Sequence, residues 1–379
     1  MSEPLSKPTA PVQKERIPEL DGLRAISVAL VIVYHSWLYA KTVQVPLGLS
    51  WLIDYVGLLG VKIFFVISGF IITRLMLEEL SATGRFSARV FFIKRVFRII
   101  PAFWTYLSVV TLLVGLGVIS SDTSNMIPSL LFTSDFLQWG SSFFYAHSWS
   151  LSVEEQFYIL FPLLVGLLVR KGTRFTTVLL ATLYVLVIFS PNLGKIVRVH
   201  FHLIDIGFLT HFRYIIGGVL LSLWWKLFGH SIRRTNWLFF LAAVTCLLGM
   251  AYIQYTRPEA VFVAKYFFMF VEPALITVLL GWILYRPVYS GVLRLPAMQW
   301  LGRTSYSIYL WQQLFTSKSD LYLTVRHPGL LGSILLILLC ATLSYYFIER
   351  PFNAMGRRHI RKRKEAAAVD NPPVVLSNV

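Results

Sequence analysis

Arg24 and His35 lie in the first long apolar stretch of the chain, where each constrains the fold. They are eleven positions apart, so on a helix they share one face and lie roughly 16 Å apart along its axis. A cation and an imidazole inside a membrane helix are costly unless each faces a polar group. This face therefore offers an anion-binding group and, further along, a group that can move a proton or carry an acyl group.

The composition is that of an integral membrane protein. Of the 379 residues, 56% are hydrophobic and 14% are charged, whereas in soluble domains roughly a quarter of all residues are charged. The net charge of +17 does not indicate nucleic acid, because the Lys and Arg residues gather at the ends of apolar segments. Cys246 and Cys340 both lie inside apolar runs, so the sequence predicts neither a disulfide framework nor a metal site.

Ten apolar runs are long enough to cross a bilayer. They lie at 23–40, 56–80, 99–119, 153–169, 175–189, 212–228, 237–253, 266–285, 305–325 and 330–348. We therefore predict an all-α, polytopic integral membrane protein with about ten transmembrane helices.

The basic residues indicate how the chain is oriented. The loop between the second and third runs carries five Lys or Arg residues, whereas the segment 120–147 carries none. Lys195 and Arg198, after the fifth run, are an exception to this alternation. By the positive-inside rule, we expect a multi-pass protein of the inner (plasma) membrane with both termini in the cytoplasm.

Three parts of the chain are distinguished by polarity. Residues 1–16 are too hydrophilic for a cleaved signal and are expected to form a cytoplasmic tail. Residues 17–352 form the predicted transmembrane domain. Residues 353–379 are basic and are predicted to be a disordered cytoplasmic tail.

Charged residues at the entries of two later spans are candidates for function. Arg95 and Arg98, spaced i and i+3, share a helix face and can each bind two phosphate oxygens. The alternative is that this run of charges only stops translocation of the chain through the membrane. Glu155, three residues after Ser152, fits a capping box. Glu154 has no such structural role, and a carboxylate entering a membrane span is a functional candidate.

Other polar or small residues have structural interpretations. Lys62 is expected to extend its amine to the membrane surface, and Gly60 and Gly69 are expected to allow close helix packing. Glu349 and Arg350, at the end of the last span, are interpreted as an ion pair at the interface rather than as catalytic groups.

Six short motifs occur in a fixed order along the chain. They are Asp21-Gly22-Leu23-Arg24-Ala25 with His35, and the segments 64–70 (FFVISGF), 95–98 (RVFR), 149–158 (WSLSVEEQFY), 305–311 (SYSIYLW) and 349–351 (ERP). In this order they resemble acyltransferase family 3, the membrane O-acyltransferases that decorate surface polysaccharides, lipopolysaccharide O-antigen, Nod factors or macrolides. The resemblance spans roughly residues 17–352.

The resemblance implies about ten helices, acyl-CoA as the donor, and functional roles for Arg24, His35, Arg95 and Arg98. Gln312 departs from the pattern, because many relatives have His after the Tyr-Leu-Trp run; this counts against proton transfer there, although Gln still forms hydrogen bonds. The extracytoplasmic esterase-like domain of longer relatives is not seen, so the protein is expected to act alone or with a separate extracytoplasmic partner.

Acyl transfer to a hydroxyl needs a bound activated donor, a base and a stabiliser of the oxyanion. We expect Arg24, Arg95 and Arg98 to hold the phosphates of cytoplasmic acetyl-CoA or another acyl-CoA. His35 is expected to be the general base or a carrier of the acyl group, and Glu154 to orient His35 or bind the acceptor hydroxyl. The expected acceptor is a cell-surface or exported carbohydrate or glycolipid, with no metal involved.

Three alternatives stay open at this stage. The acceptor can be a cytoplasmic molecule, as for macrolide-modifying relatives, or the protein can be a subunit that relays acyl groups to an external esterase. A multi-span transporter also has many helices with buried charges. The family resemblance and the lack of visible repeat symmetry count against a transporter.

Overall fold

The computed structural model describes residues 17–38, 46–136, 143–188, 207–232, 234–256 and 261–370. The predicted N-terminal tail, the exceptional loop with Lys195 and Arg198, and residues 371–379 lie outside this part. Within it the chain is helical, and its only β-type pairing is an isolated bridge between Ile119 and Tyr322.

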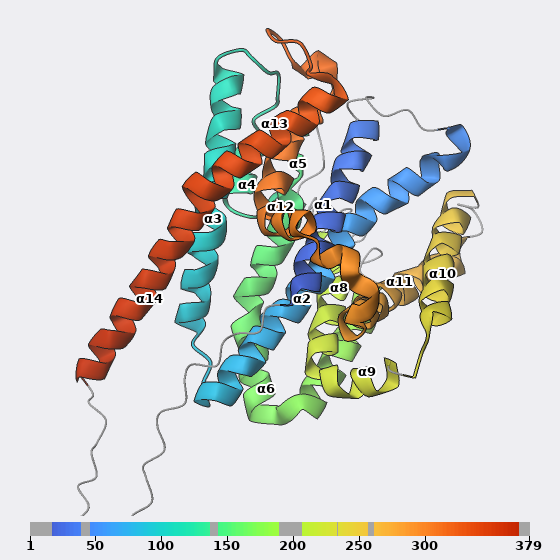
Figure 1. The fold of residues 1–379 in the computed structure, drawn as a ribbon, viewed down its shortest axis with the longest axis vertical. Coiled ribbons are helices and arrows are strands. Elements are labelled where there is room, and N and C mark those ends of the chain that lie inside the picture. The colour runs from blue at the N-terminus through green and yellow to red at the C-terminus, as the bar shows by residue number, and fades with distance from the viewer. Residues whose placement is uncertain are drawn as a thin grey trace, which may run out of the picture.

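The helices follow one another along the chain (Figure 1). They are α1 (Pro18–Leu38), α2 (Ser50–Thr83), α3 (Ala88–Gly115), α4 (Met126–Leu130), α5 (Phe143–Ala146), α6 (Ser148–Ile188), α8 (Gly207–Leu223), α9 (Trp225–Ile232), α10 (Trp237–Thr256), α11 (Val261–Tyr285), α12 (Pro296–Phe315), α13 (Gly329–Ser344) and α14 (Arg350–Asp370). One π-helical turn, Tyr345–Glu349, joins α13 to α14.

This architecture confirms the all-α membrane fold, but it does not confirm about ten spans. In the described residues six helices are long and apolar enough to cross a membrane, or seven if α8 and α9, bent by 85°, form one span. Two predicted runs belong to α6, which bends at Gly172 and counts once. The helices α1 and α12 are not among the six, and both mix polar or charged residues with apolar ones.

The first helix occupies the interior of the bundle. It packs against α2 and against α12, and α2 packs in turn against α8 (Figure 1). A Cβ atom at Gly60 would lie 2.5 Å from the carbonyl oxygen of Ser27 on α1, and one at Gly69 would lie 2.2 Å from that of Ile215 on α8. These contacts confirm that the two glycines permit close helix packing.

The C-terminal segment differs from its prediction. Residues 353–370, predicted to be disordered, continue α14 as a helix. Arg, Lys and Ala are frequent there, and all three favour the helix. Part of α14 also packs against α3, and the rest extends away from the bundle (Figure 1).

Candidate active site

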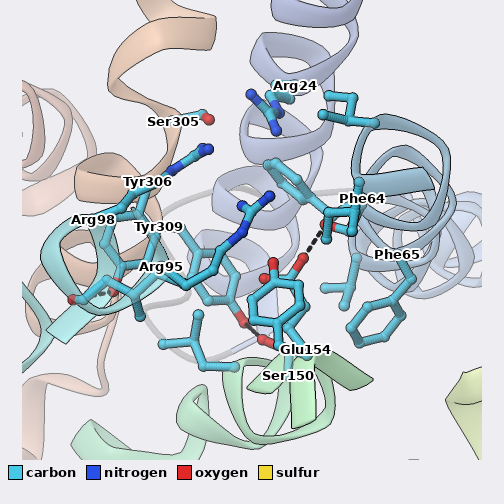
Figure 2. A pocket seen from close by; sticks show the side chains of 17 residues that line it. Arg24, Phe64, Phe65, Arg95, Arg98, Ser150, Glu154, Ser305, Tyr306 and Tyr309 are labelled. Carbon is cyan, nitrogen blue, oxygen red and sulfur yellow. Dashed lines mark hydrogen bonds between the residues drawn. The ribbon is translucent and has the colours of Figure 1, made fainter. Parts of the chain in front are cut away.

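Five helices surround a small cavity near the centre of the bundle (Figure 2). Its lining comes from α1, α2, α3, α6 and α12. The charged residues of the lining are Arg24, Arg95, Arg98 and Glu154. Four of the five predicted site residues, separated widely in the sequence, thus meet at one place.

The beginning of α1 is fixed against the segment that leads into α12, and this fixes the depth of Arg24. The Nε atom of Arg294 donates to Glu19 Oε1 at 2.6 Å, and the buried Glu19 is held in an ion pair. The side-chain amide of Gln299 donates to the Pro18 carbonyl oxygen at 2.7 Å. Arg24 follows these anchors within two helical turns and reaches the cavity.

The three arginines direct their guanidinium groups into the same space (Figure 2). Arg95 lies over aromatic rings, with its guanidinium carbon 4.9 Å from the centroid of Tyr158 and 5.5 Å from that of Phe91. Among the described residues, none of the three arginines forms a salt bridge with a carboxylate. With three cations and one carboxylate in its lining, the cavity is suited to an anion.

Glu154 faces this cavity rather than His35. Its carboxylate accepts a hydrogen bond from the Ser68 hydroxyl on α2 (Figure 2). The Nδ1 atom of His35 instead lies 2.9 Å from Oε1 of Gln312. The predicted orientation of His35 by Glu154 is therefore not observed, and Gln312, the residue that departs from the family pattern, is its partner.

His35 lies just beyond the cavity rather than in its lining. Gln312 is one turn along α12 from Tyr309, which does line the cavity. Thr316 also donates to Gln312 Oε1, at 3.1 Å. Because a carboxamide oxygen only accepts, Nδ1 of His35 carries the proton and Nε2 is the nitrogen able to take one up.

His147 is a candidate that the sequence reasoning missed. It is 3% exposed, and neither ring nitrogen has a hydrogen-bond partner in the described part of the chain. Its ring centroid is 5.0 Å from that of Tyr106 and 5.6 Å from that of Tyr309, and it interacts electrostatically with His35. A buried polar ring without partners is costly, which marks a candidate functional group. Its position directly before the 149–158 motif was the available signal.

Two carboxylates with predicted structural roles are placed differently. Ser152 lies inside α6 and bonds to the Ser148 carbonyl oxygen, so it does not form a capping box with Glu155. Glu349, 4% exposed, accepts from the Ser307 hydroxyl. The neighbouring Arg350 is exposed and lies over the Tyr346 ring. The π-helical turn that ends at Glu349 directs this carboxylate into the bundle, and π turns are frequent at functional sites.

A second cavity leads away from the first. The two share Ile72, Arg95 and Arg98 in their linings. The second cavity, of about 250 Å³, adds Lys94 from α3 and Arg357 from α14. A mainly cationic lining, which also includes the carboxylate of Glu79, therefore extends from the arginines to the exposed Arg357 on α14. Within the described residues, no group of three or more His, Cys, Asp or Glu is placed to hold a metal ion.

Comparisons with known proteins agree with this picture. A family model described as "Acyltransferase domain" matches residues 17–349. The chain is 28% identical to "Putative peptidoglycan O-acetyltransferase YrhL" of Bacillus subtilis, over 92% of this chain and 56% of that protein. It is 30% identical to "Putative O-acetyltransferase SACOL0978" of Staphylococcus aureus, over 92% of this chain and 59% of that protein.

A further relative is "O-acetyltransferase OatA" of Staphylococcus aureus, 27% identical over 90% of this chain and 58% of that protein. The chain thus spans between 56% and 59% of the length of these three relatives. No solved structure gives a significant match to the chain.

Proposed function

This chain belongs to acyltransferase family 3, and from that premise we propose that it transfers an acetyl group from cytoplasmic acetyl-CoA to a hydroxyl of an exported or cell-surface carbohydrate. The names of the three relatives support the acetyl group, and the name of YrhL supports peptidoglycan as one such acceptor. We also propose that the membrane is the plasma membrane, with both termini in the cytoplasm.

The convergence of Arg24, Arg95 and Arg98 is the observation that carries this proposal. Three guanidinium groups from two helices face one cavity whose lining contains a single carboxylate. Coenzyme A carries several phosphate charges, and the planar guanidinium group binds phosphate oxygens in pairs. The donor would therefore satisfy cations that are otherwise costly to bury.

The second cavity supports entry of the donor from the side of α14. Lys94 and Arg357 extend the cationic lining from the arginines toward that surface. The helix α1 is continuous from Pro18 to Leu38, so His35 stands about 16 Å beyond Arg24. This distance is close to the length of the pantetheine arm of coenzyme A, which would bring the thioester to His35.

In this mechanism Nε2 of His35 accepts the proton of the acceptor hydroxyl. The hydroxyl oxygen forms a bond to the thioester carbonyl carbon, the carbon–sulfur bond breaks, and the coenzyme A thiolate leaves with a proton. A variant in two steps passes through an acyl-imidazole on the same nitrogen. We assign Gln312 the positioning of His35, and His147 a second proton-accepting role beside His35. Glu154 faces the arginine cavity and interacts electrostatically with Arg24 and Arg95, so we do not assign it the acceptor hydroxyl at His35.

The proposal is tested by following labelled acetyl groups. Purified protein should hydrolyse or transfer acetyl from acetyl-CoA, and mass spectrometry of surface glycans from a deletion strain should show the loss of an acetyl increment. Intact glycans together with an absence of thioester turnover would reject the acyltransferase proposal. A lost modification of a cytoplasmic molecule instead would reject the exported acceptor.

The orientation is tested with single cysteines in a protein that lacks Cys246 and Cys340. A cysteine at Ser124 should react with an impermeant maleimide in intact cells. A cysteine at Ser87, at the start of α3 and near the second cavity, should react only after permeabilisation. The reverse labelling would place the arginines toward a compartment without coenzyme A and would overturn the transmembrane transfer.

A further inference from the structure

A second group of buried charges lies between α2, α8 and α11, outside the cavity of Figure 2. The Nζ atom of Lys62 lies 2.6 Å from Oε1 of Glu272 on α11, and the Tyr214 hydroxyl donates to Oε2 at 2.6 Å. The prediction that Lys62 reaches the membrane surface is therefore wrong, since its amine is bound inside the bundle. Both oxygens of Glu272 are occupied, and its charge is matched by that of Lys62.

Arg213 adds a second cation to this group, in which Glu272 is the one carboxylate among the described residues; Glu272 is paired with Lys62 and also interacts electrostatically with Arg213. Arg213 precedes Tyr214 on α8, is 6% exposed, and its guanidinium carbon lies 5.2 Å from the centroid of the Tyr214 ring. Its Nε and Nη1 atoms have no hydrogen-bond partner in the part of the chain that the structure describes. A buried guanidinium with unused donors in a membrane helix is costly, and an anion would relieve that cost.

An apolar groove adjoins Arg213. It has a volume of about 440 Å³ and lies between α6, α8 and α11. Gly217, in its lining, is one helical turn after Arg213 on the same face of α8. Tyr184, also in its lining, interacts electrostatically with Arg213. A groove with apolar walls therefore lies one helical turn along α8 from a buried arginine with two unpartnered nitrogen atoms.

We propose that this groove binds an anionic membrane lipid with a phosphate head group, whose acyl chain lies along the groove while its phosphate accepts hydrogen bonds from Arg213 and its net negative charge offsets that of the guanidinium group. The walls favour a hydrocarbon chain over water, and the guanidinium group favours phosphate through paired, charge-assisted hydrogen bonds. A free anion would satisfy the arginine but would leave the apolar walls uncovered. The inference does not rest on the proposed enzymatic reaction.

Lipid binding by the full chain in a neutral detergent tests the proposal. Phosphatidylglycerol, phosphatidylcholine with the same chains, and inorganic phosphate are added in turn, and thermal unfolding and native mass spectrometry are recorded. Phosphatidylglycerol alone should remain bound and raise the unfolding temperature. Arg213→Gln should weaken its binding about tenfold or more. Arg358→Gln, an exposed arginine of α14, is the matched control and should bind as the wild type does.

A variant in the groove lining tests the contribution of the lipid's acyl chain to binding separately from that of its head group. Ala181, in the lining, is exposed, so Ala181→Trp should fill the groove without disturbing the core and should weaken phosphatidylglycerol binding with Arg213 intact. Equal binding of the two lipids, unchanged binding by Arg213→Gln, or equal protection by inorganic phosphate would each overturn the proposal. If Arg213→Gln does not fold, the binding of the two lipids to the wild-type protein and to Ala181→Trp still tests the proposal.

Discussion

The protein buries cations in two places and satisfies them differently. Between α2 and α11, Lys62 is paired with Glu272, and Tyr214 completes the carboxylate's hydrogen bonds. Around the cavity of Figure 2, three arginines converge without a salt bridge within the described residues. A charge that is paired inside the chain has its cost of burial offset by its partner, whereas a group of charges left unpaired is available to a ligand.

Of the substitutions considered, the loss of His35 should have the largest effect, and this effect should be on acetyl transfer. We expect His35→Ala to abolish acetyl transfer while the protein remains inserted in the membrane, because in the proposed mechanism Nε2 of His35 takes up the hydroxyl proton. The measurement is transfer of labelled acetyl from acetyl-CoA, normalised to the amount of protein in the membrane. Wild-type acetylation would refute the role, and activity that falls only with abundance would indicate a structural histidine.

Breaking the paired group should affect stability rather than donor use. Glu272→Gln leaves Lys62 without its counter-charge and should lower the free energy of unfolding by about 3 kcal/mol or more. Removing both charges, with Lys62→Met added, should recover most of this loss. Glu78→Gln, which breaks the exposed pair with Arg74, is the control and should cost about 0.5 kcal/mol or less. A double variant as unstable as Glu272→Gln would show that the pair is not self-contained.

Removing an arginine of the unpaired group should affect donor use rather than stability. Arg98→Ala should raise the half-saturating acetyl-CoA concentration about tenfold to a hundredfold, since hydrogen bonds to charged groups are typically worth about 1.5–3 kcal/mol. Arg98→Lys should restore this only in part. Arg89→Ala, an exposed arginine of the same helix, serves as the control. Lower turnover at saturating donor with unchanged donor dependence would contradict the assignment.

The smallest effect is expected at the partner of His35. Gln312→Leu removes the neutral hydrogen bond to His35, together with those to Gln313 and Thr316, and should reduce turnover about twofold to tenfold, with the acetyl-CoA dependence unchanged. Gln312→His should retain activity, because a histidine nitrogen can take the place of the carboxamide oxygen. Turnover unaffected by Gln312→Leu would show that His35 is positioned by other contacts.

The arginines could be identified from the sequence because helical spacing, and the free-energy cost of a charge in an apolar segment, both depend only on neighbouring residues. Arg95 and Arg98 share a face on any helix, and a charge within an apolar run is visible without a structure. The helical nature of the runs was predictable for the same reason. The number of spans was not confirmed, because the runs on either side of Gly172 count as one helix, and because α1 and α12 mix polar or charged residues with apolar ones.

Contacts between distant helices could not be predicted from spacing. Lys62 and Glu272 are separated by most of the chain, so the sequence alone favoured a lysine that reaches the membrane surface. The contact of His35 with Gln312 likewise depends on helix packing, and Glu349, the last residue of the π-helical turn, is buried because it meets Ser307 on α12. Each outcome depends on which helix lies opposite, and that is decided by the packing of the whole bundle.

The helix α14 has a kinetic consequence for a negatively charged substrate. Arg357 lines the second cavity, and exposed Arg358, Arg361, Lys362 and Arg363 follow it along the same helix. A row of like charges at an entrance attracts counter-charged molecules from a distance, and dissolved salt screens that attraction within about 10 Å at 0.1 M. With acetyl-CoA as the donor, capture from dilute solution will therefore slow as ionic strength rises, while turnover at saturating donor stays constant.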